Sequence, residues 1–409
     1  QEDVGRFLPY VALGNTQTTW EEEGKNYLAQ IEDRLAESAT AKELALEQTA
    51  TLDQHPFKIR ALAAYVQQNL TYQAIEFGRR ARIMNKASQI IRNKYGDCKD
   101  HSLLLYQLLR AVDVPAHLVL VSTIGDLEED LPSLDQFNHM IVYLPEFEGG
   151  RFVDCTDKDI SVTLPVPVGL AEKRALVLEP GRIRLASIPA YPKPQRNVVL
   201  SRDVEIVDTT DFLVREKVVL SGYLSGFMRT TLASYPGVER KSVIQSLLAD
   251  GSHRVEVQDF SVENLQDPEM PLTINVQYRL KNRLEQVGNR LVGKLPALWE
   301  AYFLSSTYVE NRTTPFQLAT PLRLASQLRL SIPAELSVVS LNKPQTDLDG
   351  QFMQWKATAK MENTRRVSMA FELLRGSGHY KAEAYAQYHE MSETACRASS
   401  PNLVLGKQP

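Results

Sequence analysis

In the first third of the chain, apolar side chains recur every three or four residues, which is the spacing of amphipathic helices. A first apolar stripe, which we expect to serve packing, is formed by Trp20, Tyr27, Leu28, Ile31 and Leu35. A second helix starts at Pro56 and has a face formed by Ile59, Leu62, Ala63, Val66 and Leu70. A third starts at Cys98 and should be deeply buried through Leu104, Leu105, Leu108 and Leu109.

The pattern then changes to one typical of strands. Three stretches read as strands of one sheet: 116–122, 137–144 and 151–155. With Leu144 opposite Gly149, the last two form a hairpin with a four-residue loop, and His139 lies opposite Asp154. Residues directly opposite each other share a face, with Cβ atoms roughly 4.5–5.5 Å apart. This register predicts that the His139 and Asp154 side chains meet.

From residue 197 on, short stretches of alternating apolar and polar residues are separated by turn signals, as in an antiparallel β-sandwich. A helix is expected at 238–248. The apolar segment 295–304 fits either a partner-binding patch or a buried packing helix, and this half shows no catalytic set.

These patterns predict an α+β protein whose catalytic core has helices packed on an antiparallel sheet, followed by an all-β sandwich. We expect four parts: a helical lead-in packing on the core at 1–55, the core at 56–187, a Pro-rich linker at 188–196, and a β-sandwich with inserted helices at 197–409.

Composition narrows the functional classes. A length of 409 residues suits two or three domains, and a net charge of −4 gives no electrostatic case for nucleic-acid binding. No apolar run approaches the roughly 18 residues of a membrane helix. The three cysteines are too scattered for a disulfide framework, and no metal spacing is visible, so we expect no cofactor and no metal.

Cys98 is the most informative residue. Asp97 is a natural N-cap, so the thiol falls in the first helical turn, where unpaired N–H groups and the helix dipole favour a thiolate. The alternative is a small buried hydrophobe, as most free cysteines are. The polar neighbours Lys99, Asp100 and His101 argue against that alternative, and we expect Lys99 and Asp100 to solvate and cap the helix start.

A thiol nucleophile needs a base and a group that orients the base. His139 and Asp154 follow in that order on adjacent predicted strands. His101 is the alternative candidate for the base. It lies three residues after Cys98 on the same helix, and no nearby acidic residue in the sequence is placed to orient its ring. An oxyanion hole needs the Cys98 backbone N–H and a second hydrogen-bond donor. The candidates for this second donor are Tyr72, Gln73, Tyr95 and Asn138, and the sequence does not choose among them.

The segments 95–101, 137–139 and 153–156 together resemble the transglutaminase-like superfamily, most closely its bacterial branch with an N-terminal β-domain of the DUF3857 type. The resemblance covers about residues 1–190. It implies a papain- or transglutaminase-like core in which Cys98 is the nucleophile, His139 the general base and acid, and Asp154 the orienter. Cys155 departs from the family, where a proline is usual.

Two further expectations concern the whole protein. The chain begins after the position of the expected β-domain and shows no leader sequence, so we expect a mature or trimmed chain. Relatives of this kind are commonly exported in Gram-negative bacteria, and we therefore expect a periplasmic or secreted location rather than a cytoplasmic one.

Two functional classes remain. The first is a cysteine enzyme that acts on a peptide or other amide through a thioester, by hydrolysis, deamidation or acyl transfer to an amine. Hydrolysis is preferred because the acidic loop 123–136 looks solvated. The second is a non-catalytic module that binds a peptide or an envelope partner. An intact Cys-His-Asp set favours the enzyme, with a peptide or protein substrate and room for a protein partner on the β-sandwich.

Overall fold

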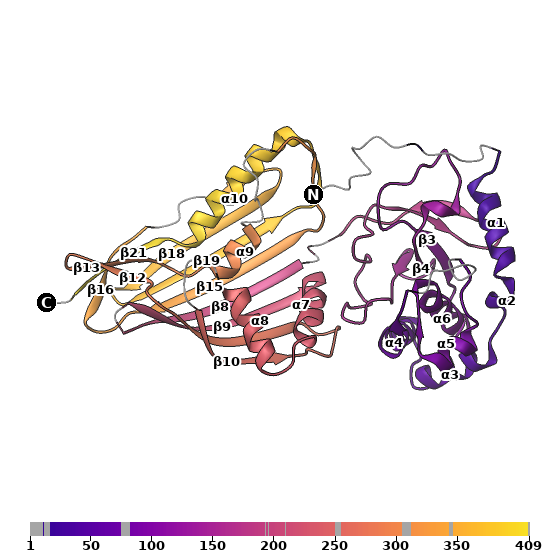
Figure 1. Cartoon of the computed structure of the whole chain (residues 1–409), viewed down its shortest axis with the longest axis horizontal. Helices are drawn as coiled ribbons and strands as arrows, with labels where there is room; N and C mark the ends of the chain where they lie inside the picture. The colour runs from indigo at the N-terminus through magenta and orange to yellow at the C-terminus, as the bar shows by residue number, and fades with distance from the viewer. Residues whose placement is uncertain are drawn as a thin grey trace. The chain divides into compact units, whose positions relative to one another are not determined.

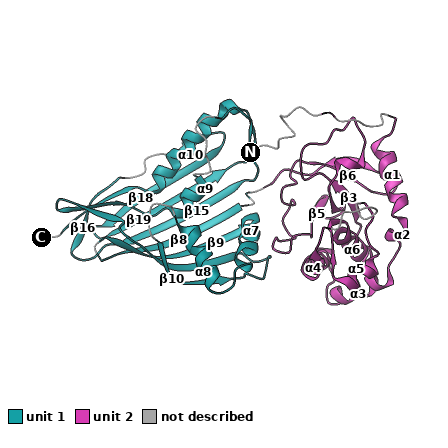
Figure 2. Ribbon diagram, viewed as in Figure 1, with its two compact units in different colours: residues 1–2, 193–409 teal, residues 3–192 magenta. Residues whose placement is uncertain are grey.

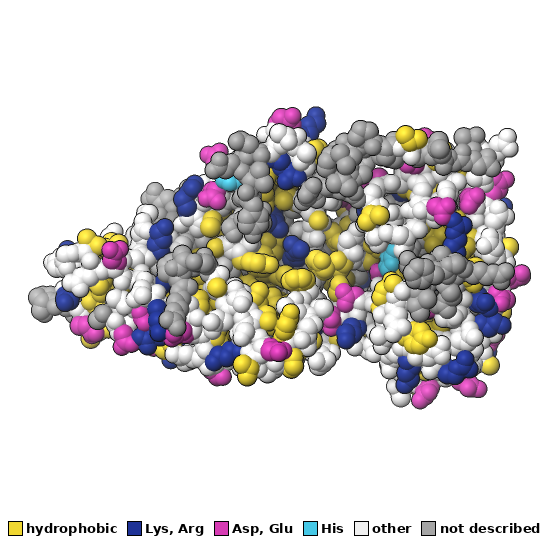
Figure 3. Space-filling model, in the orientation of Figure 1, with side chains coloured by type: hydrophobic (Ala, Val, Ile, Leu, Met, Phe, Trp, Pro, Cys, Tyr) yellow, Lys and Arg dark blue, Asp and Glu magenta, His cyan; other side chains and the backbone are white. Residues whose placement is uncertain are grey.

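The computed structural model describes residues 11, 17–74, 82–192, 194, 196–208, 210–249, 255–304, 312–342 and 347–407. The chain divides between residues 192 and 193 into two compact units, here called the N-terminal and C-terminal units (Figure 2). Within the described ranges, no helix is long and apolar enough to cross a membrane. Figure 3 shows acidic and basic side chains interspersed over the visible face, without a large area of one sign.

The N-terminal unit combines helices with a five-stranded antiparallel sheet of order β5-β4-β3-β6-β7 (Figure 1). Its helices are α1 (Trp20–Gln30), α2 (Glu32–Leu35), α3 (Ala39–Thr49), α4 (His55–Asn69), α5 (Ala87–Asn93) and α6 (Cys98–Arg110). Its strands are β3 (His117–Val121), β4 (His139–Leu144), β5 (Arg151–Val153), β6 (Arg174–Val177) and β7 (Arg184–Ser187). A separate parallel pair joins β1 (Thr71–Tyr72) to β2 (Tyr95–Gly96).

Helix α6 forms the centre of this unit. It is buried from Cys98 to Leu109, and it packs against α3, α4, α5 and strand β4. Its apolar face joins one core cluster with Tyr27 and Ile31 from the start of the chain. The helix begins at Cys98 behind the N-cap Asp97, as the sequence predicts. The first helix is also confirmed, with a capping box between Thr19 and Glu22.

The hairpin between β4 and β5 differs from its predicted register. Leu144 pairs with Arg151 and Val142 with Val153, so the prediction that Leu144 lies opposite Gly149 is wrong. The loop has six residues, 145–150, because its last turn uses left-handed backbone at Gly149 and Gly150, with φ of 80° and 104°. The shift is two residues, and a shift of two leaves every side chain on its original face.

The C-terminal unit is rich in strands. Its main sheet has the order β10-β11-β9-β8-β15-β19-β18-β17. These strands are β8 (Arg196–Val207), β9 (Asp211–Gly222), β10 (Val255–Glu263), β11 (Leu272–Leu280), β15 (Leu322–Ser331), β17 (Leu348–Asp349), β18 (Met353–Asn363) and β19 (Arg366–Arg375). A four-stranded sheet contains β12 (Leu284–Val287), β13 (Arg290–Lys294), β21 (Asn402–Lys407) and β16 (Leu336–Leu341), and a further pair joins β14 (Phe316–Leu318) to β20 (Gly378–Tyr380).

Alternation along the strands creates the core of this unit. In β8 and β15 every second side chain is buried, so the main sheet has one apolar face. The second sheet and four helices contribute to the same hydrophobic cluster. The helices are α7 (Tyr223–Ala233), α8 (Val238–Leu248), α9 (Leu298–Leu304) and α10 (Tyr385–Ser399). The segment 295–304 is therefore a packing element, since Trp299 and Phe303 are buried in α9.

A charged network lies inside the C-terminal unit. Arg202 donates to both carboxylate oxygens of Glu300, at 2.7 and 3.0 Å, and also to Glu216. Tyr278 donates to the other Glu216 oxygen at 2.9 Å. Burial raises the pKa of Glu216 above its usual range, although the Arg202 charge opposes that rise. One guanidinium thus holds two buried acids, and removing it would leave them uncompensated.

We expect Arg202→Met to lower the free energy of unfolding of this unit by about 3–5 kcal/mol, the cost of leaving a buried ion network without one partner. Arg329→Met is the matched control, because Arg329 makes an exposed pair with Asp203 and should change stability by about 0–1 kcal/mol. Urea unfolding followed by tryptophan fluorescence in a Trp20→Phe background measures both, since the other tryptophans lie in this unit. Equal effects of the two substitutions would contradict the prediction.

Candidate active site

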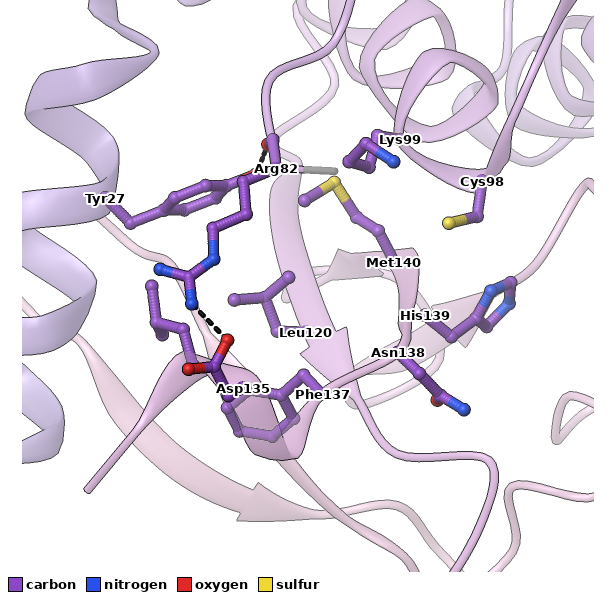
Figure 4. A pocket seen from close by; sticks show the side chains of 11 residues that line it. Tyr27, Arg82, Cys98, Lys99, Leu120, Asp135, Phe137, Asn138, His139 and Met140 are labelled. Atoms are coloured by element: carbon purple, nitrogen blue, oxygen red, sulfur yellow. Dashed lines mark hydrogen bonds and ion pairs between the residues drawn. The ribbon is translucent and has the colours of Figure 1, made fainter. Parts of the chain in front are cut away.

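A cavity of about 240 Å³ opens beside the start of α6 (Figure 4). We call it the Cys98 cavity. Its walls come from α1, from the start of α6, from β3 and β4, and from the loop that precedes β4. The lining residues are Tyr27, Arg82, Cys98, Lys99, Leu120, Leu134, Asp135, Phe137, Asn138, His139 and Met140. Two of the three residues predicted as a catalytic set, Cys98 and His139, therefore face one space.

Cys98 owes its place to the helix start. The Asp97 side chain accepts hydrogen bonds from the backbone N–H groups of Lys99 at 3.1 Å and Asp100 at 3.4 Å, which begins the helix at Cys98. The thiol is almost completely buried in the protein yet lines the cavity. In Figure 4 the Cys98 sulfur and the His139 ring lie at the same end of the cavity.

His139 meets the third member of the set. Its Nε2 donates to Asp154 Oδ2 at 2.7 Å, which leaves Nδ1 as the ring nitrogen on the other side. With the observed register, Asp154 follows the last residue of β5 and lies diagonally across from His139 rather than opposite it. Diagonal neighbours on one face are within reach of long side chains. The other carboxylate oxygen of Asp154, Oδ1, accepts two hydrogen bonds from Thr156. One comes from the backbone N–H at 3.0 Å and the other from the hydroxyl at 2.7 Å.

The charges at this end of the cavity support one another. Burial alone would lower the pKa of His139, but the Asp154 carboxylate, its hydrogen bond and the neighbouring Cys98 raise it to about 10. Burial likewise would raise the pKa of Asp154, and the charge and hydrogen bond of His139, with those from Thr156, hold it below its usual range. The site therefore stabilises an imidazolium beside the Asp154 carboxylate.

A hydrogen bond between α6 and β4 maintains the spacing of the pair. Ser102, one turn after Cys98, donates its hydroxyl proton to the carbonyl of Met140 at 2.8 Å, and both residues are buried. Met140 directly follows His139 in β4. The contact ties the helix that carries the thiol to the strand that carries the imidazole. The sequence contains no signal for it, because the serine sits inside an apolar helix.

The polar neighbours of Cys98 are not solvated, which corrects the expectation for Lys99 and Asp100. Lys99 is 5% exposed and its Nζ donates to Asp97 Oδ2 at 2.8 Å. Asp100 is fully buried and accepts from Asn85, from its backbone N–H at 2.7 Å and its side-chain amide at 3.2 Å. The start of α6 lies inside the unit, so each polar side chain there takes a protein partner.

His101 lies away from the thiol. Its Nδ1 donates to the Asp97 carbonyl at 2.9 Å, its ring lies 5.8 Å from that of Tyr72, and it is absent from the cavity wall. Cys155 is a buried side chain whose pKa is raised by burial and by the Asp154 charge. Neither residue competes with His139 or Cys98 for the cavity.

The four candidates for a second oxyanion donor separate into two groups. Tyr72, Gln73 and Tyr95 lie on or next to the β1–β2 pair, and none of them lines the cavity. Asn138 does line it, but its amide oxygen accepts from the Thr123 backbone N–H at 2.8 Å and its amide nitrogen donates to the Thr123 hydroxyl at 2.9 Å. That pairing fixes the loop before β4.

The far end of the cavity comes from residues that the sequence did not single out. Tyr27 on α1 donates its hydroxyl proton to the Arg82 carbonyl at 2.7 Å. The Arg82 guanidinium pairs with Asp135 at the exposed rim. A tilted contact between Trp20 and Phe137, with ring centroids 5.6 Å apart, holds the lead-in helix against this wall. Only tertiary packing brings α1 to the cavity.

No cluster of three or more His, Cys, Asp or Glu side chains that could hold a metal ion occurs in the described parts of the chain. The arrangement at the Cys98 cavity thus consists of a thiol, an imidazole, a carboxylate and a buried ammonium, which is a set suited to nucleophilic and acid–base chemistry.

Parts of the chain are similar to known proteins. Residues 40–151 match the model of the transglutaminase-like superfamily, which agrees for this part of the chain with the resemblance expected from the motifs. The narrower DUF3857 branch stays a prediction. A candidate protease of Parabacteroides distasonis has the same fold, with a TM-score of 0.55 and 13% identity over 93% of this chain. The chain spans 58% of the length of that structure. No curated protein matches the chain significantly.

Two further solved structures are similar over smaller parts. A candidate cysteine protease of Cytophaga hutchinsonii is 19% identical and covers 31% of this chain and 42% of its own, with a TM-score of 0.22. Legionella pneumophila LapG is 14% identical and covers 44% of this chain and 83% of its own, with a TM-score of 0.21. Both TM-scores are too low to bear on the fold.

We expect His139 to titrate near pH 10. Because its pKa is raised in the folded protein from about 6.5, the imidazolium stabilises the fold fully below about pH 6.5, and this contribution is lost as the pH rises through about 10. Asp154→Asn removes the largest raising cause and should lower the His139 pKa markedly. NMR of histidine-labelled protein measures both; a wild-type midpoint near 6.5 would contradict the prediction.

We also expect Cys98 to react with iodoacetamide near neutral pH much faster than the other two cysteines. Cys98 lines the cavity beside His139, whereas burial raises the pKa of both Cys155 and Cys396. A time course with peptide mass mapping of the folded protein gives the three rates. Comparable labelling of all three thiols would refute the assignment of a reactive thiol.

Proposed function

We propose, from the membership of residues 40–151 in the transglutaminase-like superfamily, that this chain is a cysteine-dependent amide hydrolase. In this proposal Cys98 is the nucleophile, His139 the general base and acid, and Asp154 the group that orients the imidazole. One observation carries it: the His139–Asp154 bond of 2.7 Å leaves Nδ1 for the thiol in the cavity that Cys98 shares.

The proposed reaction has two halves. In the first, the Cys98 proton passes to His139 Nδ1, where the raised pKa of the ring, about 10, holds it at neutral pH, and the sulfur attacks the amide carbonyl carbon. The tetrahedral intermediate collapses as His139 protonates the departing amine, which leaves a thioester on Cys98. In the second, water gives a proton to His139 and attacks the thioester, and the released thiol regains its proton. The net change is one amide and one water converted into an acid and an amine.

Asp154 supports both halves without reacting. Its Oδ2 accepts the Nε2 proton, so the neutral ring carries its lone pair on Nδ1, the nitrogen left for the thiol. Its charge also stabilises the imidazolium that forms when the thiol loses its proton. Thr156 holds the carboxylate through two hydrogen bonds, and Ser102 holds α6 against β4. The proposed catalytic geometry therefore rests on hydrogen bonds from neighbouring side chains.

Water is the proposed acceptor because the rim of the cavity is exposed. Residues Thr123 and Ile124 in the loop before β4 are exposed, as is Asp135 beside the cavity. An amine that attacks the same thioester would give acyl transfer, so transfer is the alternative outcome of the test. The peptide or protein substrate is likewise part of the proposal.

The C-terminal unit offers less support for a binding role than its sequence predicts. Of the aromatic residues Trp299, Tyr302 and Phe303, only Tyr302 is exposed, at 53%. The other two pack inside the unit beside the Arg202 network. A protein partner on this unit stays a prediction, as does the periplasmic or secreted location.

We expect Cys98→Ala to abolish turnover on a panel of peptide and glutamine amides while changing thermal stability little, because a first-turn thiol on a cavity contributes little packing. His139→Ala should lose nearly as much, since residues that act as one unit are not additive. Asp154→Asn should keep the fold and lose less activity than either, because it misplaces the imidazole tautomer without removing the base.

The measurement is turnover of each variant with and without a millimolar primary amine such as cadaverine, which reacts slowly with a thioester unless the enzyme binds it as an acceptor. Amide formed with cadaverine in preference to acid would identify acyl transfer, and acid as the main product in its presence supports hydrolysis. A matched control is Cys396→Ala, which removes a thiol in the other unit and should retain wild-type turnover. Full activity in Cys98→Ala would end the enzyme proposal.

A further inference from the structure

Lys99 is a buried cation in the wall of the Cys98 cavity, next in sequence to the proposed nucleophile. Figure 4 shows its ammonium nitrogen on the same helix start as the Cys98 sulfur, above the cavity. The proposed reaction does not use it. A lysine is seldom so deeply buried without a reason, because removing its charge from water costs free energy.

The ammonium has donor capacity that the protein does not use. Of its three N–H groups, one is taken by Asp97 Oδ2 at 2.8 Å, and the described residues give it no second acceptor. The other carboxylate oxygen of Asp97, Oδ1, accepts hydrogen bonds from the backbone N–H groups of Lys99 and Asp100. Lys99 therefore keeps N–H groups that can donate to a group inside the cavity.

The other polar groups of the cavity are engaged elsewhere. The Asn138 amide is paired with Thr123, and the Tyr27 hydroxyl donates to the Arg82 carbonyl. The Arg82 guanidinium is 48% exposed at the rim and is paired with Asp135. Among the described lining residues, Lys99 is thus the buried side chain with donors to spare.

The rest of the wall is apolar. Four side chains make up this surface: Leu120, Leu134, Phe137 and Met140. A volume of about 240 Å³ suits a chain of a few carbon atoms. An apolar stem that ends in an oxygen acceptor would contact these walls and meet the ammonium, and a carboxylate forms the stronger, charge-assisted hydrogen bond.

We propose that the Cys98 cavity is the acyl-side subsite of the enzyme and that Lys99 selects acyl donors bearing a carboxylate a few carbons from the reacting carbonyl, as on an acidic peptide. The inference rests on the proposed function, because it needs Cys98 to accept the acyl group. It adds a substrate class, anionic acyl donors, and a specificity residue that contacts the substrate.

Two activated esters of equal length test the proposal. p-Nitrophenyl hydrogen succinate carries a carboxylate where p-nitrophenyl butyrate carries a methyl group. Acylation is followed by intact-protein mass against Cys98→Ala, because the succinate also loses p-nitrophenolate by internal attack of its own carboxylate. The wild-type protein should be acylated faster by the succinate than by the butyrate, after correction for their reactivity with a free thiol. Lys99→Met should lower the succinate rate about tenfold to a hundredfold, the value of a charge-assisted hydrogen bond, and leave the butyrate rate within twofold.

Two controls separate recognition from folding. Lys42→Met removes the same charge from the exposed surface of α3 and should leave both rates unchanged. Lys99→Met leaves the buried Asp97 without its cation, so the double variant Asp97→Asn with Lys99→Met is made as well; it removes both charges and keeps a capping side chain. The double variant should show the same loss of succinate preference. Equal loss on both esters would overturn the proposal, because Lys99 would then act on the carbonyl or the thiol.

A second readout needs no acyl transfer. The rate of Cys98 alkylation by iodoacetate, relative to iodoacetamide, compares an anionic with a neutral reagent at one sulfur. Lys99→Met should lower that ratio severalfold, and an unchanged ratio would overturn the proposal. If neither ester acylates the wild-type protein, the proposed enzyme fails, whereas the alkylation ratio still decides whether Lys99 draws an anionic group to the cavity.

Discussion

Helix α6 begins inside the protein, and the N-terminal unit is arranged around that constraint. The first N–H groups of a helix have no partner within it, and here they lie away from water. Asp97 supplies acceptors for two of them, and its remaining oxygen must then be satisfied by Lys99. Burying the helix start therefore also buries a cation, in the turn that carries the thiol.

The same constraint extends outward from the turn. Asp100 is held by Asn85, and Ser102 bonds to the strand that carries His139. Asp100 and Ser102 each take a partner from a different segment of the chain, so the helix start is connected to the loop before α5 and to β4. A catalytic set assembled from distant segments needs such connections, because small errors in placement cost large factors in rate.

The two units deal with buried charge in contrasting ways. In the C-terminal unit, one guanidinium satisfies two carboxylates in the middle of an apolar core, and the network opens onto no described cavity. In the N-terminal unit, the buried charges of Lys99 and His139 border a cavity. The first arrangement suits structure alone, whereas the second leaves donors and acceptors facing a space that a substrate can enter.

The sequence by itself determined the elements of the site: the cap at Asp97, the helix from Cys98, and the alternation that puts His139 and Asp154 on one face. These are local properties, set by side-chain spacing and by backbone hydrogen bonding within a few residues. The faces survived an error of two residues in the hairpin register, because side chains alternate with a period of two. The six-residue loop itself was missed, because the pair Gly149-Gly150 marks a turn without fixing how many residues the loop contains.

Only the tertiary structure decided the surroundings of the thiol. Lys99 and Asp100 look like surface residues in the sequence, and they are buried because α3, α4 and α5 pack around α6. Tyr27 reaches the cavity because a helix some seventy residues earlier packs against it. Burial and long-range contact depend on how whole elements pack, and no local pattern of residues encodes which side chains will share a cavity.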